Sequence, residues 1–198
     1  MEQTLVMATQ NPFKLAEAKQ ILEPLGFRVL TPKEAGYSGD LTETGTTLEA
    51  NATEKAQQLY KATGFHAFAD DTGLEVYSLR GQPGVYSARY AGESAKAEDN
   101  MQKLLVEMAP MDDRKARFRT VIALFLNGCL HLFEGAVAGH INKAPKGSSG
   151  FGYDPVFVPE GDERTFAEYH SEEKNAISHR GRALRAMEHY LKRLEHMP

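Results

Sequence analysis

The chain has 198 residues, a formal net charge of −4 and 41% hydrophobic residues. This length can bury one complete core, so we expect a single domain spanning residues 1–198. The acidic balance disfavours nucleic acid as a partner, because nucleic-acid-binding proteins usually carry a basic surplus.

The location of the protein is indicated by its apolar runs and its cysteine. The longest apolar run near the start, Leu5–Ala8, is too short for a signal peptide or a membrane span, so we expect no membrane partner. The single cysteine, Cys129, excludes an internal disulfide and is typical of a reducing compartment. Lying between Leu126 and Leu130, it is interpreted as a buried strand thiol. We therefore expect a cytoplasmic protein.

Apolar periodicity predicts strands and helices in alternation. In chain order we expect a strand at 4–8, a helix ending at Gly26, a strand at 27–30, a helix at about 46–62, a strand at 66–69 that stops at two aspartates, a helix at 94–109, strands at 117–126 and 129–137, and a helix from about 178 to 195. Thr46 and Glu49 predict a capping box for the second helix. Asn127-Gly128 predicts a tight hairpin, so the fold class is α/β with a mixed sheet.

The first motif that indicates chemistry follows the first strand. Asn11 suits the N-cap of the next helix, and Pro12 suits its first position because proline has no N–H to leave unpaired. Lys14 then lies in the first turn, where a positive charge is unfavourable for the helix itself. A helix N-terminus with an added lysine is a suitable site for an anion such as phosphate.

The second motif is Asp70-Asp71-Thr72-Gly73. Adjacent carboxylates on an extended chain point to opposite faces, so the two aspartates are not expected to share a proton. A carboxylate at this position can bind Mg²⁺ together with phosphate oxygens and water. Glu43 is a second candidate ligand. Lys55 lies one helical turn after Asn51, and both side chains can face the same phosphates.

The third motif combines the glycine-rich run 147–155 with Lys174 and the tripeptide Ser178-His179-Arg180. Glycines, an aromatic residue and several side-chain donors are suited to holding a flat, polar heterocycle. Together with the first two motifs, this pattern indicates an enzyme that binds a nucleoside triphosphate at both ends.

In their order and spacing these segments resemble the Ham1/RdgB family of inosine triphosphate pyrophosphatases. The resemblance runs from Thr9–Lys14 to Ser178–Gly181 and includes the segments 43–45, 69–74, 83–89 and 151–155. It implies an elongated, two-lobed fold of the Ham1/Maf type, with a mixed central sheet flanked by helices and the active site in the cleft. It also implies a homodimer that uses Mg²⁺ to hydrolyse the noncanonical purine nucleotides ITP, dITP and XTP to monophosphate and pyrophosphate, which removes them from the nucleotide pool.

The resemblance also implies a role for each matching residue. Asp71 is implied as general base and metal ligand, and Glu43 as a second metal ligand. Gln10 departs from the family pattern, in which glycine is frequent at this position. The implied substrate-binding set comprises Thr9, Gln10, Asn11, Pro12, Phe13, Lys14, Lys55, Thr72, Phe151, Gly152, Tyr153, Asp154, Lys174, Ser178, His179 and Arg180.

Two other functions remain open at this point. One is a nucleotide- or RNA-binding module without catalysis, in which Phe151 and Tyr153 serve as stacking surfaces. The carboxylates near the phosphate motif count against it, because they repel phosphate unless a metal intervenes. The other is a Maf-like pyrophosphatase that acts on modified pyrimidine nucleotides through different base contacts.

Overall fold

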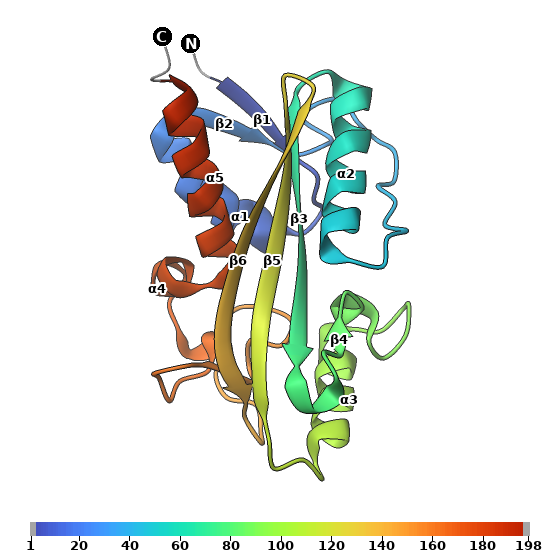
Figure 1. The fold of residues 1–198 in the computed structure, drawn as a ribbon, viewed down its shortest axis with the longest axis vertical. Coiled ribbons are helices and arrows are strands. Elements are labelled where there is room, and N and C mark those ends of the chain that lie inside the picture. The colour runs from blue at the N-terminus through green and yellow to red at the C-terminus, as the bar shows by residue number, and fades with distance from the viewer. Residues whose placement is uncertain (1–2, 196–198) are drawn as a thin grey trace. The chain divides into compact units, whose positions relative to one another are not determined.

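The computed structural model describes residues 3–195, in which helices are interspersed among the strands (Figure 1). The strands are β1 (Gln3–Met7), β2 (Phe27–Leu30), β3 (His66–Val76), β4 (Pro83–Gly84), β5 (Lys115–Leu126), β6 (Cys129–Ile141) and β7 (Phe157–Pro159). The helices are α1 (Pro12–Leu22), α2 (Leu48–Thr63), α3 (Ala97–Met108), α4 (Ser171–Ile177) and α5 (His179–Glu195). None of these helices is long and apolar enough to cross a membrane.

The strands of the described residues form one mixed sheet in the order β2-β1-β3-β5-β6-β7, with β4 beside β3. β1 runs parallel to both β2 and β3, whereas β4 is antiparallel to β3 and β7 is antiparallel to β6. The predicted α/β class with a mixed sheet is therefore confirmed. Helix α4 and the short strands β4 and β7 have no counterpart in the sequence prediction.

The chain contacts divide the protein into two compact units. Unit one comprises residues 1–71, 120–135 and 180–198, and unit two comprises residues 72–119 and 136–179. The division falls inside β3, β5 and β6, so these strands contribute residues to both units. The expectation of a single domain stays a prediction.

In unit one, α1 and α5 cover one face of the sheet (Figure 1). Phe68 of β3 and Ile122 of β5 are fully buried there, in one cluster with Ala18 of α1 and Leu184 of α5. Because successive strand residues point to opposite faces, Asp70 lies on the same face as Phe68.

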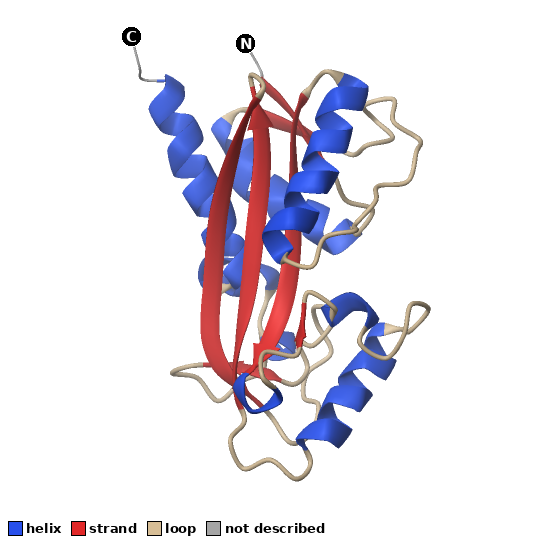
Figure 2. Ribbon diagram, turned by 45° about the vertical axis from the view of Figure 1, so that its right-hand side comes forward, coloured by secondary structure: helices blue, strands red, loops and turns tan. Residues whose placement is uncertain are grey.

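Helix α2 covers the opposite face of the strands in unit one, as Figure 2 shows. The ring of Tyr60 on α2 stacks on Phe125 of β5 with a centroid distance of 5.7 Å. Ala67 and Ala69 of β3 are fully buried between successive larger residues, and their small side chains let the helix approach the sheet. Asp71 follows the same alternation and lies on this second face.

In unit two, the core joins α3 to the second half of β3 and to an aromatic cluster. Leu104 and Met108 of α3 are fully buried in this core. The rings of Phe118 and Phe157 lie 4.6 Å apart, and that of Phe166 lies 5.1 Å from Phe157. Rings at these separations add favourable edge and face contacts to the burial of their surface.

Two details of the predicted elements are wrong. β3 does not stop at the aspartates but continues to Val76, because Leu74 and Val76 are buried and Gly73 lets β4 approach closely. A Cβ atom on Gly73 would lie 2.6 Å from the carbonyl oxygen of Gly84. The N-cap of α2 is Thr47, one residue after the predicted Thr46, and its hydroxyl accepts a hydrogen bond from the Ala50 N–H.

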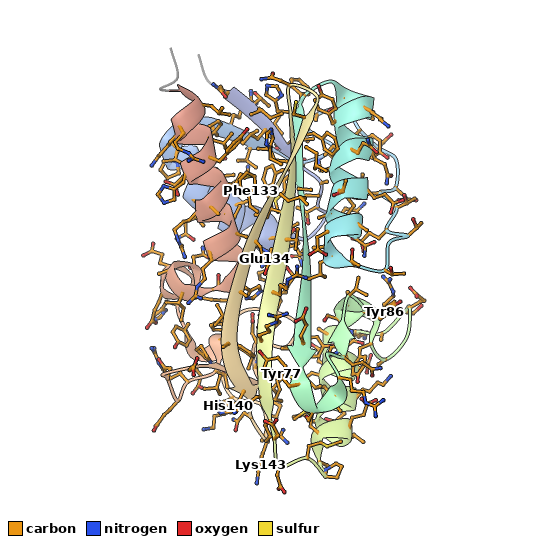
Figure 3. All side chains as sticks on the ribbon, in the orientation of Figure 1. Tyr77, Tyr86, Phe133, Glu134, His140 and Lys143 are labelled. Carbon is orange, nitrogen blue, oxygen red and sulfur yellow. The ribbon has the colours of Figure 1, made fainter. Side chains whose placement is uncertain are left out.

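The hairpin is confirmed, but the buried thiol is not. Asn127 and Gly128 both have positive φ, 51° and 81°, as a tight two-residue hairpin turn requires. Cys129 follows directly and is exposed, because the turn places it at the end of the hairpin. Further along β6 the exposure alternates: Phe133 packs against the core of unit one, whereas Glu134 is exposed (Figure 3).

The pairing of β6 with β7 depends on Gly139, which lies opposite Pro159. A Cβ atom on Gly139 would lie 2.2 Å from the Val158 carbonyl oxygen, so Gly139→Ala must displace β7. We expect this substitution to lower the free energy of unfolding by about 1–3 kcal/mol in urea denaturation. The matched control is Ala138→Ser at the neighbouring exposed position. Equal stability of the two variants would contradict this strand pairing.

Candidate active site

The loop after β1 and the first turn of α1 form the first part of the candidate site. Asn11 is the N-cap, as predicted, and its side-chain oxygen accepts hydrogen bonds from Phe13 N (2.9 Å) and Lys14 N (3.4 Å). Pro12 occupies the first helical position. Thr9 supports the cap, since its hydroxyl accepts the N–H of Asn11 at 3.1 Å. The first turn contains no acidic residue, so its positive dipole end is not offset by a helix carboxylate.

Lys14 joins a buried ion-pair network beneath this turn. Its ammonium lies 3.1 Å from an oxygen of Asp70. The same oxygen accepts a hydrogen bond of 2.9 Å from Arg180 Nε, and Arg180 Nη1 donates to Glu17 at 2.6 Å. Asp70 and Arg180 are each only 1% exposed. The network therefore links α1, β3 and α5 on the first face of the sheet.

The charges of this network set its protonation. Burial acts to raise the pKa of Asp70, but the neighbouring charges of Lys14 and Arg180 outweigh burial and hold the pKa far below its usual value. Burial also lowers the pKa of Lys14; Asp70 opposes this shift and Arg180 adds to it. Asp70 is therefore ionised, and an anion bound near Lys14 would favour the charged form of the lysine.

On the second face, Asp71 meets two residues of α2. Asn51 Nδ2 donates a hydrogen bond of 3.1 Å to the Asp71 carboxylate, and Lys55 Nζ lies 3.9 Å from its other oxygen. Lys55 also forms an ion pair with Glu43 and donates to the backbone oxygen of Asp70 at 2.9 Å. The expected divergence of the two aspartates is confirmed, because Asp70 contacts α1 and α5 whereas Asp71 contacts α2.

The surroundings of Asp71 change the pKa of its carboxyl group. Its pKa is raised, first by burial and then by the charge of Glu43, while Lys55 and the Asn51 hydrogen bond act in the opposite direction. The pKa of Lys55 is also raised: burial lowers it, but Asp71, Asp70 and Glu43 more than compensate. Three carboxyl groups thus act on one ammonium, and one of them, Asp71, has the raised pKa that suits a general base.

The donor set fits a hard divalent cation. Glu43 and Asp71 both converge on the Lys55 ammonium, so their oxygens already surround a positive charge. Magnesium commonly uses one or two carboxylates and completes its shell with water and phosphate oxygens. Within residues 3–195 no group of three or more His, Cys, Asp or Glu side chains could hold a metal. A metal at Glu43 and Asp71 would thus rely on substrate and water for its other ligands.

The glycine-rich run and Lys174 form a second cluster, within unit two. One oxygen of Asp154 accepts hydrogen bonds from Phe151 N and from Lys174 Nζ, both at 2.8 Å. The Lys174 ammonium lies 4.9 Å from the centre of the Phe151 ring. Gly150 and Gly152 have positive φ, 77° and 65°, which lets the loop turn tightly around the Asp154 carboxylate. The run thus presents a half-buried aromatic ring beside an ammonium group.

Other predicted base-binding residues of unit two lie deeper in the fold. Tyr153 belongs to the core and donates a hydrogen bond of 2.8 Å to the carbonyl of Ser87, so its ring is not an exposed stacking surface. The His179 ring stacks on Phe118 at 4.5 Å and is 3% exposed. Ser178 is buried where α4 ends.

The predicted residues therefore fall into two sets. Unit one contains the predicted residues 9–14, Glu43, Lys55, Asp71 and Arg180, whereas unit two contains Thr72, Phe151, Gly152, Tyr153, Asp154, Lys174, Ser178 and His179. Within unit one, Asp70 joins Lys14 to Arg180 on one face of the sheet, and Lys55 joins Glu43 to Asp71 on the other. The sequence motif groups Arg180 with the base-binding residues, but the hydrogen bonds described above join it to Asp70 and Glu17. Sequence reasoning missed Glu17; its only signal was its position one turn after Lys14 on α1. Gln10 and Phe13 are exposed beside the cap.

The fold and the motifs match one protein family. A model of the Ham1 family matches residues 5–190, and the chain belongs to this family. It is 49% identical to a dITP/XTP pyrophosphatase of Christiangramia forsetii over 94% of this chain and 98% of that protein, and 44% identical to a protein of the same name from Bacillus subtilis over 92% and 93%. The resemblance found in the motifs is thus confirmed.

Solved structures agree with this membership. The HAM1 protein of Coxiella burnetii superimposes with a TM-score of 0.88 at 41% identity and covers 96% of this chain and 99% of its own. The Ham1 protein of Staphylococcus aureus has a TM-score of 0.86 at 38% identity, with 96% and 98% covered. The backbone that positions the candidate site is therefore shared with these proteins.

The placement of Arg180 leads to a prediction about stability. Arg180→Ala leaves Asp70 and Glu17 as buried carboxylates without their guanidinium partner, which typically costs about 3–5 kcal/mol. We expect a loss of this size in urea denaturation at neutral pH. Arg193→Ala, at an exposed position of the same helix, is the control. A variant at position 180 as stable as the unsubstituted protein would contradict a structural role for the buried ion pairs.

Proposed function

We propose that the protein hydrolyses ITP, dITP and XTP to the monophosphate and pyrophosphate, and so removes noncanonical purine nucleotides from the nucleotide pool. The proposal rests on the surroundings of Asp71, a carboxylate that has a raised pKa and shares the Lys55 ammonium with Glu43. The family relatives named dITP/XTP pyrophosphatases support this activity. They also favour it over a Maf-like enzyme and over a binding module without catalysis.

In this proposal the loop after β1 and two lysines contact the triphosphate. Lys14, Lys55 and the N-terminus of α1 attract the phosphate oxygens, with Thr9 and Asn11 shaping the loop and its neighbours Gln10, Pro12 and Phe13 completing it. Lys14 exchanges part of its contact with Asp70 for phosphate, while Arg180 remains with Asp70. Each hydrogen bond from a lysine ammonium to a phosphate oxygen neutralises part of the negative charge of the triphosphate.

Asp71 is the proposed general base. It accepts a proton from a water molecule whose oxygen attacks the α-phosphorus, and the bond between that phosphorus and the bridging oxygen of the pyrophosphate breaks. The bond electrons leave with pyrophosphate, so no covalent intermediate with the protein forms. A Mg²⁺ ion held by Glu43 and Asp71 would supply charge neutralisation and would lower the pKa of water. Thr72 follows Asp71 and is assigned a contact with the substrate.

The glycine-rich run and Lys174 are assigned to the base. The Phe151 ring offers a stacking surface, and Gly152 and Tyr153 hold the loop in the shape that Asp154 closes. Lys174 and His179 are donors toward an oxygen on the purine ring, with Ser178 placed between their helices. Hypoxanthine and xanthine carry a 6-oxo acceptor where adenine carries an amino donor, so these donors can bond to the 6-oxo oxygen but not to the 6-amino group.

Three further properties belong to the proposal. We propose a homodimer and Mg²⁺ as the metal, both on the resemblance of the motifs to the family. We propose the cytoplasm as the location, consistent with a single cysteine, and a nucleoside triphosphate rather than nucleic acid as partner, consistent with the net charge of −4.

A comparison of several nucleoside triphosphates as substrates tests the proposed reaction. With Mg²⁺ in excess, we expect kcat/KM for ITP, dITP and XTP to exceed that for ATP by a factor of up to roughly 10⁴, because the donors of the site bond to a 6-oxo oxygen but not to a 6-amino group. IMP and pyrophosphate should appear in equal amounts from ITP. Primary formation of IDP and orthophosphate, or a preference for pyrimidine nucleotides, would contradict the proposal.

The role of Asp71 predicts a pH dependence. Only the ionised carboxylate accepts a proton, so activity falls as pH decreases through its pKa. Burial and Glu43 raise that pKa in the protein without metal, whereas a Mg²⁺ ion held by Glu43 and Asp71 would lower it, so the acid limb of kcat/KM should move to lower pH as the Mg²⁺ concentration rises. Asp71→Asn keeps the shape, and should lower turnover by roughly 10²–10⁴ and abolish the limb. If kcat/KM of Asp71→Asn still fell at low pH, another residue would be the general base. The variant Asp70→Asn serves as the comparison.

A further inference from the structure

Glu43 lies in a long segment without helix or strand, which runs from the end of β2 to the start of α2. Irregular segments of this length are usually mobile unless specific contacts hold them. The Glu43 side chain itself is 34% exposed, and its ion pair with Lys55 is the contact that holds the carboxylate. The position of the Glu43 carboxylate therefore depends on where the loop backbone lies.

The residues on both sides of Glu43 are tied to one side chain of α2. Glu54 accepts hydrogen bonds from the Thr44 N–H at 2.7 Å and from the Thr42 hydroxyl at 2.9 Å. The Thr44 hydroxyl lies 3.1 Å from each Glu54 oxygen. The hydrogen bond from Thr44 N–H, followed by that from Thr42, lowers the pKa of Glu54, so these contacts favour its ionised form.

Gln58, one turn further along α2, adds hydrogen bonds between the helix and the same loop. Its side-chain oxygen accepts the Thr42 N–H at 3.2 Å, and its amide donates to the Thr42 hydroxyl at 2.7 Å. Gly45 closes the segment against the helix, since a Cβ atom there would lie 2.6 Å from that of Ala50. The loop is thus held on both sides of Glu43.

The same helix carries the partners of the proposed metal ligands. Asn51, Glu54, Lys55 and Gln58 follow the spacing that brings helix side chains together, so one rigid element holds both the Glu43 loop and the groups that contact Asp71. Side chains that orient metal ligands typically change metal affinity by about 10–100-fold when removed. A tie of this kind therefore has a measurable effect on a metal site.

We propose that Glu54 is a positioning residue for the metal site: it ties Thr42 and Thr44 to α2 and so holds the Glu43 carboxylate beside Lys55 and Asp71. This inference rests on the proposed function, which assigns Glu43 to the metal. Glu54 touches neither the substrate nor the metal in this role and acts only through Glu43.

The test compares Glu54→Ala, Glu54→Gln and Gln57→Ala, with the last as control at an exposed position of α2. Mn²⁺ binding to the full-length protein without nucleotide is measured by electron paramagnetic resonance. The Mg²⁺ concentration that gives half-maximal ITP hydrolysis is measured separately. For Glu54→Ala we expect both values, the Mn²⁺ dissociation constant and the Mg²⁺ requirement, to rise about 10-fold, at the lower end of the usual range because the tie is exposed. Turnover at saturating Mg²⁺ should change little, and Gln57→Ala should match the unsubstituted protein.

The variant Glu54→Gln separates the tie from the charge. An amide side chain keeps an acceptor for the Thr44 N–H and adds a donor for the Thr42 hydroxyl oxygen, so the loop stays attached to α2 although the negative charge is gone. Glu54→Gln should therefore keep most of the metal affinity. A loss as large as that of Glu54→Ala would show that Glu54 acts through its charge and would overturn the positioning role.

A double-mutant cycle identifies the residue through which Glu54 acts. In a Glu43→Gln background, Glu54→Ala should cause no further loss of Mn²⁺ affinity, because the ligand that it positions is gone. Additive losses would overturn the proposal. If Glu54→Ala does not fold, as judged by circular dichroism, Thr42→Val removes the shared hydroxyl and carries the same expectation.

The two proposals fail in different ways. If the protein binds Mn²⁺ with the expected dependence on Glu54 but hydrolyses no nucleoside triphosphate, the proposed function fails and the positioning role stands. If it hydrolyses ITP but Mn²⁺ affinity and Mg²⁺ requirement are unchanged in Glu54→Ala, the positioning role fails alone. Absence of Mn²⁺ binding by the unsubstituted protein overturns it as well, since there is then no metal site for Glu54 to position.

Discussion

Asp70 and Asp71 are consecutive residues of an extended strand, so their side chains leave the sheet in opposite directions. Each carboxylate therefore meets a different layer of helices: Asp70 meets Lys14 and Arg180 on one face, and Asp71 meets Asn51 and Lys55 on the other. The strand backbone connects the two faces, since Lys55 also donates to the Asp70 carbonyl. The buried charges of unit one are arranged around this pair of neighbours.

The cations around the two aspartates differ in what they can do. Arg180 holds two carboxylates with a rigid guanidinium that keeps its proton, so it suits a permanent structural contact. Lys14 and Lys55 carry compact ammonium groups on flexible stems, and a lysine can change partners without breaking a planar pair. We infer that the arginine maintains the buried network while the lysines adjust to the ligand. The arginine is also the most buried of the three.

Local patterns predicted well those features that depend on neighbours in sequence. The cap of α1 and the Asn127-Gly128 turn follow from the conformational preferences of single residues, and both are present. Contacts between distant segments were beyond such reasoning: Arg180 and Asp70 are 110 positions apart, and the motif alone places Arg180 with the base. The course of β3 beyond Asp71 also depends on a distant partner, β4. The roles assigned to the site residues remain proposals.

The exposed thiol at the end of the hairpin affects how the proposed dimer is to be measured. Cys129 is the only cysteine of the chain and is exposed, so oxidation in air can join two copies of the protein through it. Such a cross-linked pair has the mass of a dimer in light scattering although no native interface holds it together. Mass measurements therefore require a reducing agent or the Cys129→Ser variant, in which the only pairing left is noncovalent.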